Sequence, residues 1–121
     1  MVKRTLPTNP RTRRIVKILR KASRSHNAEI WRALSEALCI PSRRRIAVNL
    51  SKIDKLTNEG DCVAVAGKVL GFGNLSKRVD VAALSFSQTA RAKITQSGGR
   101  ALSLDVLVKL NPRGRNIKIL R

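Results

Sequence analysis

Positive charge is concentrated at the two ends of this chain, and that distribution limits where a core can form. Residues 1–25 carry nine Lys and Arg and no acid, and residues 111–121 carry four more. The middle, 26–110, holds 13 basic and seven acidic side chains. Because runs of like charge repel, we expect a globular domain at 26–110 between an N-terminal basic arm and helix at 1–25 and a basic turn and strand at 111–121. We expect the 26–110 domain to fold even when residues 1–25 are removed.

The overall composition narrows the class of protein. The chain has 121 residues, a formal net charge of +19 and 42% hydrophobic residues. This length allows one compact domain with a core that needs no disulfide. The apolar content excludes a wholly disordered basic tail, and no run approaches the roughly 18 apolar residues of a membrane span. A folded and strongly cationic protein usually binds a polyphosphate.

Cysteine usage and the N-terminus bear on the compartment. Cys39 and Cys62 are isolated, and we favour buried free thiols in a reducing compartment over a disulfide. The first residues lack the apolar stretch of a secretory signal. An Arg-rich, acid-free start also fits a mitochondrial transit peptide, which Pro7, Pro10 and the scarcity of serine disfavour.

Helix signals occur twice near the N-terminus. The Asn-Pro pair at 9–10 combines a capping side chain with proline at the first helical position, and predicts an amphipathic basic helix over 10–22. We expect a break at 23–26. Asn27 can cap a second helix, which Pro41 would end.

Strands and short helices are predicted to alternate after Pro41. The first expected elements are a strand at 46–50 and a helix from Ser51, with Ser51 and Asp54 forming a capping box. A strand at 63–70 interrupted by Gly67, a loop at 71–74 and a central strand at 79–86 follow. The last are a helix capped by Ser85 or Ser87 and stopped by Gly98-Gly99, a strand at 101–103, a helix at 104–110 and a strand at 117–120. Residues 50–54, 84–88 and 102–105 resemble one another, which indicates a strand–serine–helix unit used three times.

Motifs for catalysis or cofactor binding are weak. The glycine-rich stretch 67–73 lacks the GK[ST] ending of a P-loop, and Ser76 replaces the third glycine of GxGxxG. His26 is the only histidine. Cys39, Cys62 and His26 have no standard zinc spacing. We therefore predict no enzyme activity, no cofactor and no metal.

Basic side chains recur in clusters that suit phosphate binding. One cluster alone is more typical of a solvated surface, and a basic amphipathic helix also suits a calmodulin-like or membrane-surface partner. Several clusters together with a net charge of +19 favour nucleic-acid phosphates. The candidate RNA-binding residues are Lys3, Arg4, Arg11, Arg13, Arg14, Lys17, Arg20, Lys21, Arg24, Arg43, Arg44, Arg45, Lys68, Lys77, Arg78, Arg113, Arg115 and Lys118.

Three glycines and three aromatic residues refine this hypothesis. Gly67, Gly71 and Gly73 suit either a tight loop with positive φ or close approach of an RNA backbone, and we weigh the two equally. Trp31 and Phe86 lie in apolar patterns and are expected in the core, which leaves Phe72 as an exposed ring. Proteins that bind single strands use several aromatics, so folded nucleic acid is the expected ligand.

Several motifs together resemble a known family. They are Arg-Ile-Ala-Val-Asn-Leu-Ser-Lys-Ile at 45–53, Gly-Asp at 60–61, Ala-Gly-Lys-Val-Leu-Gly-Phe-Gly at 66–73, Val-Asp-Val-Ala-Ala-Leu-Ser-Phe-Ser at 79–87, Ala-Arg-Ala-Lys-Ile at 90–94 and Gly-Gly at 98–99. The chain resembles, over essentially its whole length, the archaeal and eukaryotic large-subunit ribosomal protein number eighteen. That family is similar to the C-terminal part of bacterial large-subunit ribosomal protein number fifteen. Cys62 and Ala66 are small departures from its pattern.

The resemblance implies both a fold and a role. The implied fold is mixed α/β, an irregular superhelix of strand–strand–helix units with a basic N-terminal helical extension. The implied role is a structural constituent of the cytoplasmic ribosome, bound to large-subunit ribosomal RNA and neighbouring ribosomal proteins, without a membrane or small-molecule substrate. A DNA-compacting chromatin protein is the alternative, and an enzyme acting on RNA is disfavoured by the motifs.

Overall fold

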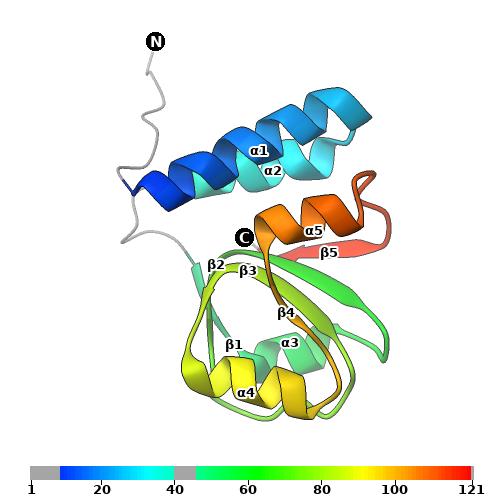
Figure 1. The fold of residues 1–121 in the computed structure, drawn as a ribbon. Helices are drawn as coiled ribbons and strands as arrows, with labels where there is room; N and C mark the ends of the chain where they lie inside the picture. The colour runs from blue at the N-terminus through cyan, green and yellow to red at the C-terminus, as the bar shows by residue number, and fades with distance from the viewer. Residues whose placement is uncertain (1–8, 40–45, 121) are drawn as a thin grey trace.

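The computed structural model describes residues 9–39 and 46–120, and these form a mixed α/β fold (Figure 1). The elements are α1 (Pro10–His26), α2 (Glu29–Leu38), β1 (Ile46–Asn49), α3 (Leu50–Leu56), β2 (Cys62–Leu70), β3 (Asp80–Phe86), α4 (Gln88–Gln96), β4 (Ala101–Ser103), α5 (Leu104–Leu110) and β5 (Ile117–Leu120). Each pair of neighbouring strands is parallel. The expected fold class is confirmed.

The central strand is β2, which pairs with three other strands. Along one edge it pairs with β3, and β3 pairs in turn with β4. Its other edge is divided between two strands: β5 pairs with residues 62–65, and β1 pairs with residues 67–70. The last strand of the chain is therefore an edge strand that completes the sheet beside β2.

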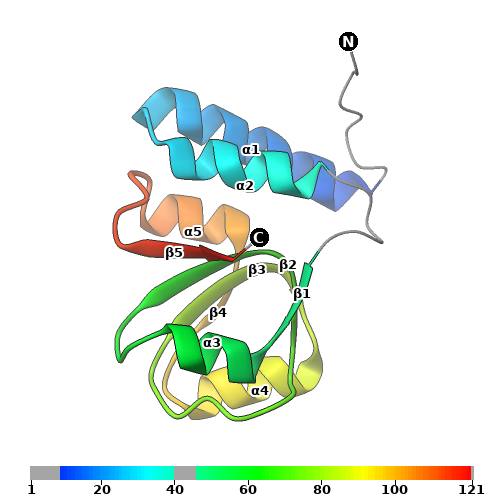
Figure 2. The same ribbon diagram turned by 180° about the vertical axis from the view of Figure 1, so that it is seen from behind.

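Helices cover both faces of this sheet, as a parallel sheet requires. One face, with Ala64 and Ala82, packs against α1, α2 and α5 in what we call the upper core. The opposite face, with Val63 and Val81, packs against α3 and α4 in the lower core. The two views agree that α1 and α2 lie at one end of the molecule and α3 and α4 at the other (Figures 1 and 2). Two covered faces explain why 79–86 is almost continuously apolar.

The boundary between α1 and α2 differs from the prediction. α1 continues to His26 instead of ending at 22, and Asn27 ends it in the left-handed conformation with φ 52°. The N–H of Asn27 bonds to the Ser23 carbonyl, so this residue is the C-cap of α1. The prediction that Asn27 caps α2 was wrong, since Ala28 holds that position without a side-chain bond. Asparagine tolerates the left-handed conformation, which suits it to a C-cap.

The capping box predicted for α3 was also wrong. The helix already begins at Leu50, and Asn49 at its N-cap makes no side-chain bond. The Ser51 N–H instead donates to the Phe72 carbonyl at 3.1 Å. Asp54 accepts hydrogen bonds from the Ser76 backbone and hydroxyl at 3.1 and 2.9 Å. A distant loop thus satisfies groups that a local cap would otherwise serve.

Gly67 does not interrupt β2, contrary to the prediction. β2 is continuous over Cys62–Leu70 because β1 pairs with residues 67–70. The register with β3 shifts between Val65 and Lys68. A Cβ atom at Gly67 would collide with the Ile46 carbonyl of β1, so glycine is required by close packing inside the sheet.

The predictions for the second half of the chain were more accurate. Ser87, and not Ser85, caps α4 by accepting the Ala90 N–H at 3.1 Å. Gly98 takes a left-handed φ of +87° just after that helix. The repeated strand–helix unit is confirmed as the junctions β1–α3, β3–α4 and β4–α5, although among these only Ser87 makes a side-chain cap.

Both basic ends contribute packed elements. The apolar stripe of α1 places Val16 and Leu19 at 0% exposure in the upper core. β5 supplies four residues to the edge of β2. Charge alone predicts a core at 26–110 that folds without the first segment, and this packing argues against that expectation. We therefore expect residues 10–26 to be needed for folding.

Candidate nucleic-acid interface

The outer surface of α1 carries a dense group of cations. Asn9 starts the helix by accepting the Arg11 N–H at 2.9 Å, with Pro10 in the first turn. The apolar side chains face the upper core, so the basic ones face solvent. The exposed cations, which we call the α1 basic face, are Arg11, Arg13, Arg14, Lys17, Lys21 and Arg24. Within residues 9–39 and 46–120, their side chains make no ion pair or hydrogen bond.

Arg20 differs from these residues. It is half-buried and donates to the Cys39 Sγ at 3.5 Å. It lines a polar groove between α1 and α2 together with Arg24, Arg32 and Glu29. Because the groove mixes both signs of charge, it is a weaker phosphate site than the α1 basic face.

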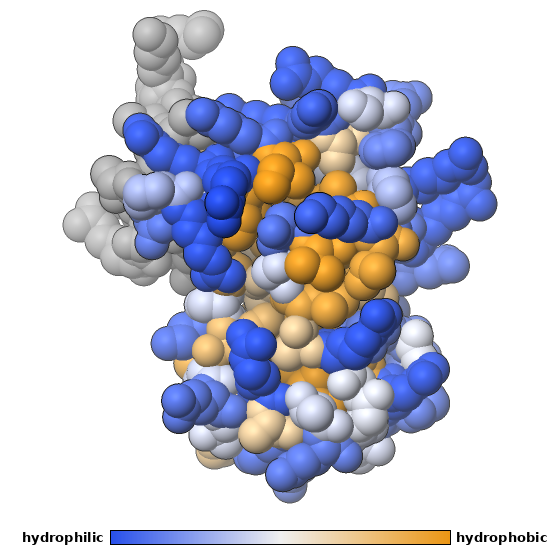
Figure 3. Space-filling model, viewed as in Figure 1, coloured by the Kyte–Doolittle hydropathy of each residue, from blue (hydrophilic) through white to orange (hydrophobic). Residues whose placement is uncertain are grey.

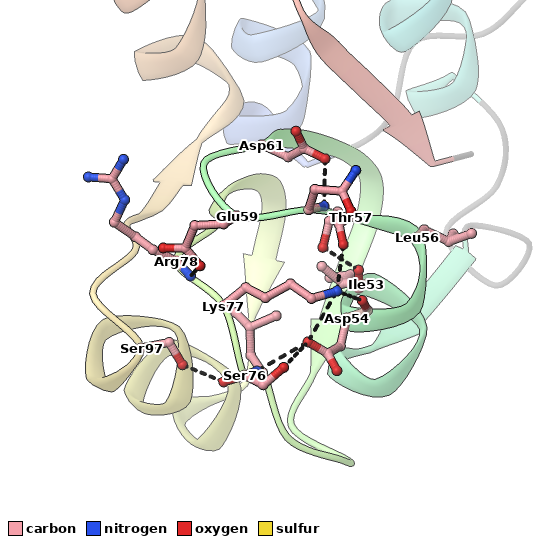
Figure 4. Close-up of polar contacts among 12 residues, drawn as sticks. Ile53, Asp54, Leu56, Thr57, Glu59, Asp61, Ser76, Lys77, Arg78 and Ser97 are labelled. Atoms are coloured by element: carbon pink, nitrogen blue, oxygen red, sulfur yellow. Dashed lines mark hydrogen bonds and ion pairs between the residues drawn. The ribbon is translucent and has the colours of Figure 1, made fainter.

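Lys77 points into the molecule instead of into solvent (Figure 4). Its Nζ donates at 2.6 Å to the carbonyls of Asp54 and Thr57 at the end of α3. β2 and β3 are parallel, yet residues 71–79 connect them without a helix. Lys77 fixes that connection to α3, and the Ser97 hydroxyl fixes it to α4 through the Leu75 carbonyl at 2.6 Å. This predicted phosphate ligand thus has a structural task.

Arg78 and Lys68 are better placed for an external ligand. The Arg78 backbone N–H donates to Glu59 at 2.9 Å, while its guanidinium points away from the cluster of polar contacts (Figure 4). Lys68 is the one exposed residue along β2. In the part of the chain that the structure describes, neither side chain has an acidic partner.

The glycines of the loop approach other segments of this chain. A Cβ at Gly71 would lie 2.7 Å from the Thr89 side chain, and one at Gly73 would lie 2.6 Å from Ser51. Gly73 also has a φ of +89°. Internal packing therefore accounts for Gly67, Gly71 and Gly73, whereas close approach of an RNA backbone to this loop stays a prediction.

The C-terminal cations, like Lys77 and Arg78, divide into those that the fold engages and those that are free for a ligand. Arg113 and Arg115 are exposed. Lys118 is engaged by the fold, since its Nζ contacts the Leu56 carbonyl and the Asp61 carboxylate, each at 3.0 Å. The turn before β5 is anchored because Trp31 Nε1 donates to the Pro112 carbonyl at 2.7 Å. The remaining predicted cations, Lys3, Arg4, Arg43, Arg44 and Arg45, lie outside the described residues.

Carboxylates are mostly occupied by internal partners, which leaves the surface positive. Asp80 pairs with Arg100 at 3.0 Å, and Glu36 with Arg32 at 3.2 Å. The two hydrogen bonds from Ser76 hold the pKa of Asp54 below its ordinary value. The Asn58 N–H and then Lys118 lower the pKa of Asp61 in the same way. Asp54 and Asp61 are therefore charged at neutral pH, and their charge is satisfied by internal partners.

Sequence reasoning missed several exposed cations. Lys52 and Lys55 lie on the solvent side of α3, three residues apart, and Lys109 lies on α5. Arg91 of α4 lies over the Phe86 ring, 5.3 Å from its centroid. The helical spacing of these cations from the buried positions could have shown that they face solvent. They were missed because single cations are less conspicuous in a sequence than runs of Lys and Arg.

The aromatic predictions hold in part. Trp31 is 0% exposed, whereas Phe86 is only half-buried beside the lower core. Phe72 is 73% exposed, as expected. On the face drawn in Figure 3, hydrophilic side chains gather at the top and along the rim, and a broad apolar region lies across the middle. Val106 and Leu110 of α5 are exposed.

The structure offers little for catalysis within the described residues. No three His, Cys, Asp or Glu side chains gather there as metal ligands. Cys39 and Cys62 are free thiols, as predicted, but they are half-buried instead of buried. Burial raises the pKa of the Cys62 thiol. Across the described ranges, none of the helices has the length and apolar character needed to cross a membrane.

Many surface cations without acidic partners, as the described residues carry on this α/β body, are typical of proteins that bind polyanions. The sequence also identifies the family. Residues 2–121 match the family described as ribosomal protein 60S L18 and 50S L18e, so the chain belongs to this family of ribosomal proteins.

Three archaeal relatives have nearly the same length as this chain. The large ribosomal subunit protein eL18 of Methanothermobacter thermautotrophicus is 48% identical over 120 residues, which is 99% of both chains. Its counterpart of the same name in Methanococcus maripaludis is 39% identical over 119 residues, 98% of this chain and 99% of the relative. The protein so named in Pyrobaculum aerophilum is 40% identical over 116 residues, 96% and 95% of the two chains.

Proposed function

We propose that this protein is a structural constituent of the large ribosomal subunit in the cytoplasm, and that it binds and stabilises folded ribosomal RNA. The α1 basic face carries this proposal, because six exposed cations on one helix lack acidic partners in the described residues. Family membership supports the placement in a ribosome. The protein has no catalytic role or cofactor in this proposal.

In the proposed mechanism, cations held on a rigid protein core neutralise RNA phosphates. RNA tertiary folding brings phosphates close together, and their negative charges repel. Arg and Lys fixed by a folded core reduce this repulsion. The cations proposed for this task are those of the α1 basic face, with Lys68, Arg78, Arg113 and Arg115. Five cations outside the described residues remain part of the proposal on sequence grounds: Lys3, Arg4, Arg43, Arg44 and Arg45. Contact of the loop glycines with an RNA backbone also remains part of it. Arg20, Lys77 and Lys118 would bind RNA only alongside their internal partners.

A competition experiment tests the RNA preference. Labelled large-subunit ribosomal RNA bound to the full chain is challenged with unlabelled RNA of the same sequence or with duplex DNA, at one fixed salt concentration. We expect the ribosomal RNA to compete at much lower concentration, because its folded shape positions phosphates that a regular duplex does not. Equal competition by duplex DNA would favour the chromatin protein and contradict this proposal.

A further inference from the structure

We propose that the Phe72 ring is a stacking platform for one unpaired base of the bound RNA. This inference rests on the proposed function, because it requires RNA at this end of the molecule. Phe72 is 73% exposed, while the other large exposed apolar side chains, Leu56, Val106 and Leu110, range from 36% to 54%. Single exposed apolar residues are common on protein surfaces. The way this ring is supported sets it apart.

The backbone around Phe72 is held on both sides. The carbonyls of Gly71 and Gly73 each accept a hydrogen bond from Lys93 Nζ at 2.8 Å. The carbonyl of Phe72 itself accepts the Ser51 N–H at 3.1 Å. Three consecutive carbonyls are thus tied to α3 and α4, so the ring is presented from a fixed loop. A ring carried on a fixed backbone has less conformational entropy to lose on binding than one carried on a mobile loop.

Packing of the flanking glycines reinforces this support. Gly71 lies against Thr89 of α4, and Gly73 lies against Ser51 of α3. Neither position has room for a side chain, and Gly73 also needs its left-handed φ of +89°. The loop is therefore wedged between two helices while its one large side chain faces solvent. Its carbonyls point inward to donors, which leaves the ring as the group available outside.

Exposed cations on the segments that adjoin the loop favour a nucleotide over an apolar protein pocket. Lys52 follows Ser51 on α3, and Lys68 precedes the loop on β2. Both side chains are exposed and lack an acidic partner within the described ranges. An exposed aromatic ring with free cations on the two adjoining segments matches the two parts of a nucleotide, because the base stacks while the phosphate takes the charge. A single ring suits one bulged or looped-out base, not a continuous single strand.

The test compares Phe72 variants of the full chain for binding to a large-subunit ribosomal RNA transcript. Phe72→Ala should weaken binding roughly 5- to 150-fold, the effect of losing one base stack. Phe72→Leu keeps an apolar side chain but should weaken binding nearly as much. Phe72→Trp should bind at least as well as the wild type, and RNA should quench its added tryptophan emission above the background from buried Trp31. Leu110→Ala is the matched control at another exposed apolar position and should bind as the wild type does.

Two outcomes would overturn the proposal while leaving RNA binding intact. One is wild-type affinity of Phe72→Ala together with unquenched Phe72→Trp. The other is wild-type affinity of Phe72→Leu, which would mean an apolar contact without stacking. A fully paired RNA duplex offers no unpaired base, so under this proposal the wild type and Phe72→Ala should bind it with equal affinity. If the wild type itself fails to bind the transcript, the proposed function fails, and this inference with it.

Discussion

Lys77 and Arg78 are adjacent cations with opposite surroundings. Lys77 Nζ bonds to the carbonyls of Asp54 and Thr57, whereas the Arg78 guanidinium faces outward (Figure 4). The sequence places both in one basic cluster. It does not reveal which one the fold engages, because the end of α3 lies about 20 residues away in the chain.

Alanine substitutions should separate these two roles. Lys77→Ala should lower the free energy of unfolding by about 1–3 kcal/mol, since two partly buried carbonyls at the end of α3 lose a charged donor. Arg78→Ala should stay within about 0.5 kcal/mol of wild type but weaken RNA binding. Urea unfolding and RNA titration of both variants measure these effects. The assignment fails if Lys77→Ala is as stable as wild type and loses the same affinity as Arg78→Ala.

Asp54 makes stability depend on acid pH. Hydrogen bonds from Ser76 hold its pKa below the ordinary value of 3.8. A lowered pKa in the folded chain gives stability that is complete well above 3.8 and is lost as pH falls through the folded pKa. Asp54→Asn should therefore be less stable than wild type at pH 7, and the difference should shrink below about pH 4. Unfolding curves between pH 2 and 7 measure this. A difference that does not change with pH would contradict it.

α1 combines two surfaces in one element. Ile15, Val16 and Leu19 are buried in the upper core, while Arg13 and Lys17 on the same turns face solvent. The amphipathic spacing predicts both surfaces from the sequence. Local patterns of this kind, including the Asn9 cap and the Ser87 cap, were predictable because their partners lie within three residues.

Substitutions on the two surfaces of α1 should have different effects. Replacing Arg13, Lys17 and Lys21 with Gln should leave stability within about 0.5 kcal/mol per site. It should also reduce the slope of log K against log salt for RNA binding by about 2–3. Leu19→Ala should cost about 2–5 kcal/mol of stability and leave that slope unchanged for the folded protein. Thermal unfolding and salt titrations measure both. An unchanged slope for the triple Gln variant would contradict the phosphate role of this face.

Features set by distant partners could not be predicted at the element scale. Asn27 is a local exception: it fits an N-cap and a C-cap equally well by composition, and the greater length of α1 makes it the C-cap. Ser51 matches a capping box, yet its N–H is satisfied by Phe72. The division of one β2 edge between β1 and β5 depends on strands far apart in the sequence. No local pattern encodes such a pairing.

At the scale of the whole molecule, the first helix and last strand are integral to one body. α1 covers the upper core together with α2 and α5. We therefore expect that deleting residues 1–25 abolishes cooperative unfolding, because it exposes the core around Trp31. Thermal unfolding followed by near-ultraviolet circular dichroism tests this. A cooperative transition in the truncated chain would mean that the basic terminus is an independent arm.

Integration into the large ribosomal subunit is the central claim, and sedimentation after a high-salt wash tests it most directly. Tagged full-length protein is expressed in an archaeal host, and ribosomes are separated on a gradient before and after the wash. We expect the wild type to stay with the large subunit, because phosphate contacts are fixed by a folded core, and the Gln variant at Arg13, Lys17 and Lys21 to dissociate at lower salt. Wild-type protein that leaves the subunit in the wash, or that sediments with DNA instead, would contradict the claim.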